Sequence, residues 1–465
     1  MKDKVKLLIL LCFFSSCSPI PKLNIRNIEN PKNIFKENNK ITYIKNIKWW
    51  EGYNDLYLNN LVEIILENNK SIEVAILNQD KAQEILNYTR GINGPDIFFN
   101  GDFKRNRLNF MDKKLADNKT ILNINTLAFS GNYTIDFFGK LDALENEVKY
   151  QIEAENQKKE YVKLDIITKT INLYGYWNYL QNEQENLNKQ KKIINQLYKL
   201  KNLKINLGSG IIDEVIKFQD IVINNQIAID TNKKEQKIIE NSLNALGSFK
   251  ENNSIQKILS QSKNFDILKN KKTPQIISSE SIVKRPDLKY YISIINSQTE
   301  KIKSLKTDFF PKIILNGELG YMAPSKQDFF SKVYLNGFLS PSIYLPILQG
   351  GRIESNYKIA GIDLNIFIEE YNDAIFQAFK NVDNNLLEVK LQKQIVDNTK
   401  SILKNHRDLF SRNKKRLEIQ TISQEELLES ELLLYTLILK EDYEYLSLFN
   451  KNLSLLNSLG GNYGS

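Results

Sequence analysis

The sequence predicts an α+β membrane protein in which a few β-strands are joined to helices far longer than those of a compact domain. Three observations support this prediction: an N-terminal export signal, four segments with alternating apolar residues, and long stretches without helix breakers that recur along the chain. The chain has 465 residues, of which 42% are hydrophobic, so it can bury a large core.

The composition excludes several classes of function. The net charge is +9, and both signs are spread along the chain, which argues against a nucleic-acid partner. Two cysteines and one histidine exclude a disulfide scaffold and Cys/His zinc sites. There is no nucleophile motif and no phosphate-binding loop, so we expect no catalytic residues, no metal, no cofactor and no enzymatic activity.

The N-terminus reads as an export signal over residues 1–16. Three lysines are followed by a short apolar run, 7–14, and by two serines. Cys17 comes next, as in a bacterial lipobox, whose cysteine is acylated and becomes the mature N-terminus. The alternative is an ordinary signal peptide with an incidental cysteine. We therefore expect Cys17 to be the lipidation site.

Four later segments show the alternation of outer-membrane strands, because every second residue is apolar over about ten residues. They are 97–103, 127–135, 313–321 and 333–347. We expect no transmembrane helix elsewhere, so a chain that enters a membrane must do so as a closed barrel. Four strands cannot close a barrel, since about eight are needed. Copies of the chain must therefore share one.

The remainder reads as helix. Residues 142–205 contain no proline, and a break at 206–210 separates them from a second helical run, 211–246. The same layout recurs over 353–416 and 422–459. A helix of 64 residues reaches roughly 95 Å, which indicates coiled coil. In the helical run over 422–459, apolar residues lie on two faces, as expected in a multi-helix tube.

The two halves of the chain repeat. Pro95 and Gly101 fall on Pro311 and Gly317 with an offset of 216, and Ser209 falls on Thr421 with an offset of 212. Each half is therefore predicted to run helix, strand, strand, long helix, long helix.

Five stretches resemble, in the same order, the outer-membrane factor family of the TolC and OprM type, and the lipobox places the chain with its lipoprotein subgroup. They are Trp49-Trp50 with the following 55–69, then 133–140, 284–288, 308–313 and 459–461. The resemblance implies a homotrimer. Three chains of four strands would form a 12-stranded outer-membrane β-barrel that continues as an α-helical coiled-coil periplasmic tunnel.

The resemblance also implies the function and the partners. The chain would be the outer-membrane exit channel of a tripartite efflux system, lipid-anchored in the bacterial outer membrane with a large periplasmic part. It would passively conduct substrates from a periplasmic adaptor (a membrane fusion protein) and an inner-membrane efflux transporter. The alternatives are the outer-membrane duct of a type I protein or peptide secretion system, and a coiled-coil scaffold or surface fibre that conducts nothing.

The expected organisation follows the repeat. The segments are 1–16 signal peptide, 17–60 lipid-anchored N-terminal segment, 61–94 helix of repeat 1, 95–138 β-barrel hairpin 1, 139–248 long periplasmic helix pair 1, 249–284 connecting equatorial segment, 285–310 helix of repeat 2, 311–350 β-barrel hairpin 2, 351–459 long periplasmic helix pair 2, and 460–465 C-terminal tail.

The expected functional site lies at the two turns between long helices. By resemblance, Glu426 and Glu429 form a periplasmic gate; they are three residues apart and so share one helix face. Arg412 and Arg416 could lock the closed state. The alternative for all four is a solvated helix surface. The tip expected to dock the adaptor comprises Gly208, Ser209, Gly210, Thr421 and Ile422.

Overall fold

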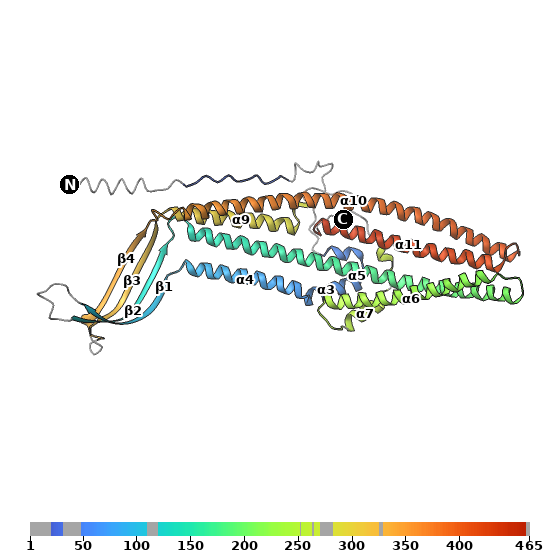
Figure 1. The fold of residues 1–465 in the computed structure, drawn as a ribbon, viewed down its shortest axis with the longest axis horizontal. Helices are drawn as coiled ribbons and strands as arrows, with labels where there is room; N and C mark the ends of the chain where they lie inside the picture. Colours follow the sequence, from blue (N-terminus) through green and yellow to red (C-terminus); the bar gives the residue numbers. More distant parts are fainter. Residues whose placement is uncertain are drawn as a thin grey trace. The chain divides into compact units, whose positions relative to one another are not determined.

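The computed structural model describes residues 20–30, 48–108, 120–251, 253–262, 265–269, 282–324 and 329–461 (Figure 1). Cys17 lies outside these residues. The chain divides into two compact units. The first comprises Met1–Ile28, Asn78–Asn156 and Tyr290–Tyr371, and the second comprises Glu29–Leu77, Gln157–Lys289 and Asn372–Ser465.

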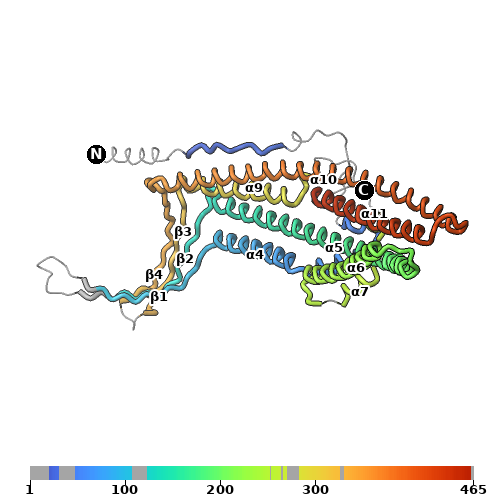
Figure 2. Tube along the Cα trace, turned by 45° about the vertical axis from the view of Figure 1, so that its right-hand side comes forward, coloured from blue at the N-terminus to red at the C-terminus, as the bar shows by residue number. Residues whose placement is uncertain are grey.

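The first unit contains one antiparallel four-stranded sheet, in the order β1-β2-β3-β4. Its strands are β1 (Asp96–Leu108), β2 (Thr120–Ile135), β3 (Lys312–Ala323) and β4 (Leu335–Tyr344), which lie side by side in Figure 2. All four predicted strands are present. β4 is shorter than predicted, because the 3-10 helix η4 (Lys332–Tyr334) precedes it and Pro346, which has no N–H for the ladder, follows it.

The strand register separates apolar from polar side chains. One row across the four strands is Phe99, Phe129, Leu319 and Gly337, and all its side chains share one face. A parallel row on the opposite face is Asp96, Asn132, Asn316 and Ser340. The sheet therefore has an apolar face and a polar face, and its outer strands β1 and β4 are not paired with each other.

The four long helices begin and end at comparable places in the two repeats. α5 (Lys140–Asn206) and α10 (Arg352–Glu418) each have 67 residues, and α6 (Ile212–Leu246) and α11 (Gln424–Ser458) each have 35. Both pairs of starting points differ by the predicted offset of 212 residues. The repeat predicted from the sequence is thus confirmed residue by residue in the helices.

Local chemistry starts these helices where the strands end. Asp136 accepts hydrogen bonds from the backbone N–H groups of Lys140, Leu141 and Asp142, so it caps α5. Gly139 precedes α5 with a φ of 74°, and its repeat equivalent Gly351 has a φ of 77°. A side chain at either position would be strained, so glycine permits the turn from strand to helix.

The first unit also contains parts of two other helices, α4 (Lys70–Ile92) and α9 (Pro286–Lys306), the latter followed by η3 (Thr307–Phe309). Residues 20–28 lie against α10. There the Asn365 side chain accepts a hydrogen bond from the Arg26 backbone N–H and donates one to the Asn24 carbonyl, each at 2.9 Å. Arg26 also pairs with Glu369 at 2.7 Å.

The second unit packs the remaining helix lengths around an apolar core. Its shorter elements are η1 (Trp49–Tyr53), α3 (Leu56–Asn68), α7 (Asn253–Gln261) and η2 (Phe265–Leu268). Leu61 of α3, Tyr174 of α5, Leu243 of α6 and Ile255 of α7 are all completely buried in this core. The predicted connecting segment 249–284 therefore supplies core residues as well as a link.

The helix predicted over 61–94 is broken in the structure. Asn69 has extended backbone angles, and its side-chain oxygen accepts hydrogen bonds from the N–H groups of Ser71 and Ile72. Its side-chain nitrogen donates to the Leu246 carbonyl at 2.7 Å. Asn69 thus ends α3 and caps α4, a role that asparagine fills well.

No helix in the described ranges combines the length and the apolar character that crossing a bilayer as a helix requires.

Candidate functional site

The two turns between the long helices have the same backbone geometry. At the first, the N–H of Ser209 donates to the Lys204 carbonyl and that of Gly208 to the Ile205 carbonyl, both at 2.9 Å. At the second, Thr421 donates to Arg416 at 2.8 Å and Gln420 to Leu417 at 2.9 Å. Both are Schellman motifs with a left-handed residue, Gly208 (φ 73°) or Gln420 (φ 58°).

The predicted tip residues lie in these turns. Gly208, Ser209 and Thr421 are exposed, and Gly210 and Ile422 are half-buried. A Cβ on Gly210 would lie 2.5 Å from the backbone nitrogen of Ile205, so this position needs glycine. Large apolar side chains are exposed beside both turns: Leu207 is 72% exposed, Ile211 60% and Ile419 71%.

A cluster of charged side chains joins three helices just behind these turns. Lys201 of α5 pairs with Glu214 of α6 at 2.8 Å and with Glu425 of α11. Lys204, one turn further along α5, also pairs with Glu425. The side chains of Lys201 and Glu425 are each only 10% exposed. The cluster therefore ties the end of α5 to the start of both α6 and α11.

The cluster keeps its members charged. Burial alone would lower the pKa of Lys201, but hydrogen bonds with Glu214 and Glu425 raise it to about 12. Burial likewise opposes ionisation of Glu425, yet hydrogen bonds with Lys201 and Lys204 hold the pKa of that carboxyl below its usual value. Lys201 also lies 5.3 Å from the centre of the Phe218 ring, which favours its cationic form.

The two predicted gate acids have separate surroundings. Glu426 is exposed and forms a capping box with Ser423, whose backbone N–H donates to the Glu426 carboxylate at 2.8 Å. The backbone and side-chain hydrogen bonds with Ser423 lower the pKa of Glu426. Glu429 has a side chain that is 48% exposed and lies 3.8 Å from Lys201. Their role as gate residues stays a prediction.

The predicted basic residues lie on the surface of α10. Arg412 and Arg416 are exposed, and within the described part of the chain neither forms an ion pair. The Arg416 carbonyl instead accepts the hydrogen bonds that form the second turn. A locking role for these residues also stays a prediction.

Sequence reasoning missed Lys201, Lys204 and Glu425. Lys204 and Glu425 are 221 residues apart in the chain. Charged residues are common on long helices, and no local spacing distinguishes these three. The repeat offers one signal, since it places the end of α5 and the start of α11 beside equivalent turns.

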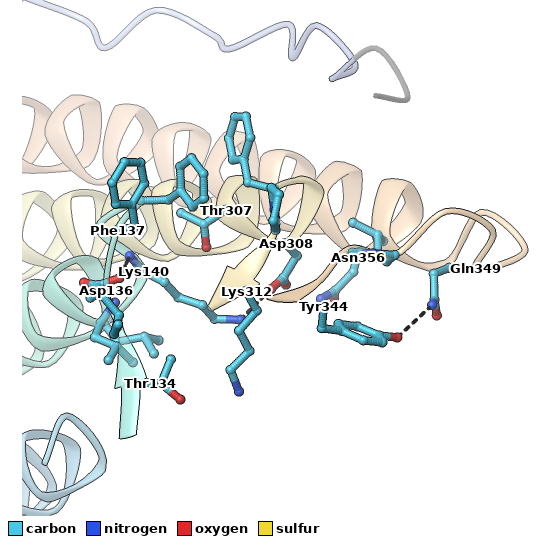
Figure 3. A pocket seen from close by; sticks show the side chains of 18 of the residues that line it. Thr134, Asp136, Phe137, Lys140, Thr307, Asp308, Lys312, Tyr344, Gln349 and Asn356 are labelled. Carbon is cyan, nitrogen blue, oxygen red and sulfur yellow. Dashed lines mark hydrogen bonds and ion pairs between the residues drawn. The ribbon is translucent and has the colours of Figure 1, made fainter. Parts of the chain in front are cut away.

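In the first unit, a cavity of about 830 Å³ lies where the strands become helices. Figure 3 shows Lys140 and Asp308 in its lining, from the junctions of the two repeats; their charged atoms are 2.5 Å apart. In the same view Tyr344 and Gln349 point toward one another and share a hydrogen bond of 3.4 Å. Phe138 stacks on Phe310 with ring centres 4.9 Å apart, so these contacts join the two hairpin ends.

The chain is similar to known proteins in both sequence and fold. Toxin and drug export protein A of Aggregatibacter actinomycetemcomitans is 25% identical over 80% of both chains. The probable efflux pump outer membrane protein TtgC of Pseudomonas putida is 20% identical over 89% of this chain and 85% of its own. The CmeC outer membrane channel of Campylobacter jejuni superposes with a TM-score of 0.77 at 19% identity, covering 96% of this chain and 95% of that one.

The superposition confirms the predicted α+β fold, which in the described part of this chain comprises four strands and two pairs of long helices. The family model described as outer membrane efflux protein matches residues 61–247 and 277–436, which is most of the sequence. The family resemblance found in the sequence is thereby confirmed, and the chain belongs to the outer membrane efflux protein family.

Proposed function

We propose that this chain is one subunit of a homotrimeric exit channel in the bacterial outer membrane, which passively conducts substrates delivered by a tripartite efflux system. The periplasmic partners would be an adaptor and, beyond it, an inner-membrane efflux transporter. The energy for transport would come from that transporter.

One observation carries the proposal: the two-faced sheet with unpaired outer strands. An apolar face suits lipid and a polar face suits a water-filled lumen. Ile97, Phe99, Leu339 and Ile343 are 63–73% exposed on the apolar face. In a bilayer the free edges of β1 and β4 must find hydrogen-bond partners. Edge pairing between three copies would satisfy both edges and close twelve strands.

The helices support the same assembly. Leu387, Leu391, Ile395, Ile402 and Leu409 follow one another along α10 at steps of four or seven residues and are 44–55% exposed. Exposed apolar residues at this spacing are typical of a helix face that packs on another helix. A neighbouring subunit is the proposed partner of this face.

The helix tips are the proposed adaptor-docking and gating region. Leu207, Ile211 and Ile419 offer apolar contacts beside the turns at Gly208–Gly210 and Thr421–Ile422. Glu426 and Glu429 are proposed to form two carboxylate rings in the trimer, which would attract cations. The cluster of Lys201, Lys204 and Glu425 would hold the closed arrangement.

The proposed anchor is acylated Cys17. Residues 20–28, which lie against α10, follow it closely, so a lipid on Cys17 would be held beside the first unit. Replacing Cys17 by serine is expected to abolish labelling of the protein by a radioactive fatty acid. Labelling that persists in the variant would contradict this assignment.

Recording from planar bilayers tests the proposed channel. Purified full-length protein should run as a trimer in native mass spectrometry and should give discrete current steps in the bilayer. A trimer without current would favour a scaffold instead. Current from a single chain would contradict the shared barrel.

One relative favours a second candidate, a duct for secreted proteins or peptides, because its name includes toxin export. A pull-down from membranes separates the two, since a secretion duct should retain an ATP-driven exporter and a drug channel a proton-driven transporter.

A further inference from the structure

Four of the described side chains on the polar face of the sheet are large, apolar and exposed: Phe98, Met322, Phe338 and Tyr344. Phe98 of β1 and Phe338 of β4 are 51% and 52% exposed, although their strand neighbours on this face are Asp96, Asn100 and Ser340. The large apolar residues needed for lipid contact lie on the other face. These rings therefore have no role in anchoring the sheet in lipid.

The register places both rings in one row with a carboxylate. Phe98 pairs with Ser130, Ser130 with Glu318, and Glu318 with Phe338. Neighbouring side chains in such a row lie about 5 Å apart at their Cβ atoms. Glu318 is half-buried, and within the described residues it forms no ion pair. The row thus offers two aromatic surfaces and one uncompensated negative charge.

The adjacent row on the same face is closely packed at its centre. It consists of Asn100, Ala128, Gly320 and Asn336. A Cβ on Gly320 would lie 2.3 Å from the Cα of Ala128, so the two strands approach too closely there for any larger residue. Ala128 is only 2% exposed, so this row offers no open space of its own.

We propose that the row of Phe98, Glu318 and Phe338 is a binding belt in the channel wall for organic cations that have an apolar body. The inference rests on the proposed function, because only a closed trimer makes the polar face a lumen. Three-fold assembly would place three copies of this row around the wall, so that each carboxylate would face the lumen with the aromatic rings of its own chain beside it. Aromatic faces and a carboxylate both attract a cation, and the rings also receive its apolar part.

Current block by a matched pair of ions tests the belt. Benzyltrimethylammonium and benzenesulfonate have similar size and opposite charge, and each is added to the barrel side of trimers in a planar bilayer. The cation should reduce the current at lower concentration than the anion. Glu318→Gln should raise its half-blocking concentration about fivefold, and Phe338→Leu about threefold.

Two control variants separate the belt from general effects. Phe99→Leu alters the apolar face and should leave the block unchanged. Asp96→Asn removes a carboxylate from the neighbouring row of the polar face and should have a much smaller effect than Glu318→Gln. Equal effects of the two acid variants, or none from Glu318→Gln, would overturn the belt.

Titration calorimetry keeps the test independent of conduction. Benzyltrimethylammonium is titrated into detergent-solubilised trimers of the same variants. Binding weakened by Glu318→Gln and Phe338→Leu supports the belt even where no current flows, a result that would contradict only the proposed channel. Binding unaltered by both substitutions rejects the belt itself.

Discussion

At the helix tips, two lysines of α5 meet a single buried glutamate of α11. Lys201 and Lys204 both pair with Glu425, and Lys201 also reaches Glu214 of α6. Buried charges are stable only when they are paired, so removal of one member leaves the others uncompensated. The integrity of the tip should therefore depend more on Glu425 than on its exposed neighbour Glu426.

Replacing Glu425 by alanine should loosen the tip, because Lys201 would lose its most buried partner. We expect a cost of about 1–3 kcal/mol to local opening and faster amide hydrogen exchange in 200–215 and 420–428. Closed channels of this variant should also pass more current. Unchanged hydrogen exchange in Glu425→Ala would show that the cluster does not stabilise the tip.

The double variant Glu426→Ala/Glu429→Ala should change the cation preference of the channel and raise its conductance.

A further acidic residue, Asp442, is buried between α5 and α11. Asp442 is only 4% exposed, and its carboxylate accepts hydrogen bonds from the side chains of Asn182 (2.6 Å) and Asn186 (3.1 Å). Burial raises the pKa of Asp442 from 3.8 to about 6; Glu441 adds to this rise, whereas Lys269 opposes it. The folded state therefore binds the proton more tightly than the unfolded state.

Because the folded state binds this proton more tightly, the protein becomes less stable as the pH rises. The favourable protonation of Asp442 is fully present below pH 4 and is lost as the pH passes through about 6. Asp442→Asn should remove this loss and stabilise the fold at pH 7.5 by up to about 3 kcal/mol. Unfolding by guanidinium at pH 5 and pH 7.5 measures the difference. Glu185→Gln, at an exposed acid on α5, is the control and should change neither value.

Among the elements, four helix ends share one motif. Left-handed residues terminate α5 at Gly208, α6 at Ser248, α10 at Gln420 and α11 at Gly460. The two members of each repeat pair are 212 residues apart. Glycine occupies one position of each pair, so the motif tolerates the strain of a side chain at the other.

Gln420→Gly should relieve that strain and stabilise the second turn by about 1 kcal/mol. Gly208→Gln should destabilise the first turn by a similar amount, because it introduces a side chain at a φ of 73°. Slower amide exchange around 416–424 in the first variant, and faster exchange around 203–212 in the second, would be measured by mass spectrometry. Opposite signs would show that contacts of Gln420, rather than its backbone, decide the stability.

The sequence predicted the elements well because their boundaries are local. Proline and glycine marked every long helix to within two residues. The alternation of apolar residues located every strand, although β1 continues to Leu108, beyond the predicted 103, and β2 begins at Thr120, before the predicted 127. The break at Asn69 was missed because its hydrogen bond to Leu246 connects positions far apart in the chain. α7 was missed because nine residues are too short to identify a helix from one sequence, although its apolar residues Ile255, Ile258 and Leu259 lie on one face.

The candidate site was harder to predict than the fold. The turns at Gly208 and Thr421 follow from short-range chemistry, and the repeat placed both. The pairing of Lys201 with Glu425 depends on which helices lie side by side, which a single sequence does not reveal. Resemblance selected Glu426, whereas the capping box shows that this residue also serves the start of α11.

For the whole molecule, exposed apolar surface and unpaired strand edges favour association with further copies of the chain. The apolar stripe of α10 and the free edges of β1 and β4 remain uncovered within one chain. Large exposed apolar surfaces mark sites of association. The stability of the assembled protein should therefore depend on residues that contribute little to the fold of the single chain.

Replacing Ile395 and Ile402 by lysine tests this dependence. Both lie on the exposed stripe of α10, so the chain should still fold, but association should weaken by about 2 kcal/mol or more at each position. Native mass spectrometry of the detergent-solubilised variant should show fewer trimers. Lys400→Ala, on another face of α10, is the control. Trimers that resist the double substitution would place the subunit contact elsewhere.

The equal helix lengths carry a constraint on how such a protein can change. α5 and α10 have the same number of residues, as do α6 and α11, so the helix pairs of the two repeats are equally long. A heptad inserted into one helix alone would leave its tip out of step with the others and would shift every interhelical contact beyond it. The lengths of all four helices must therefore change together, by whole heptads.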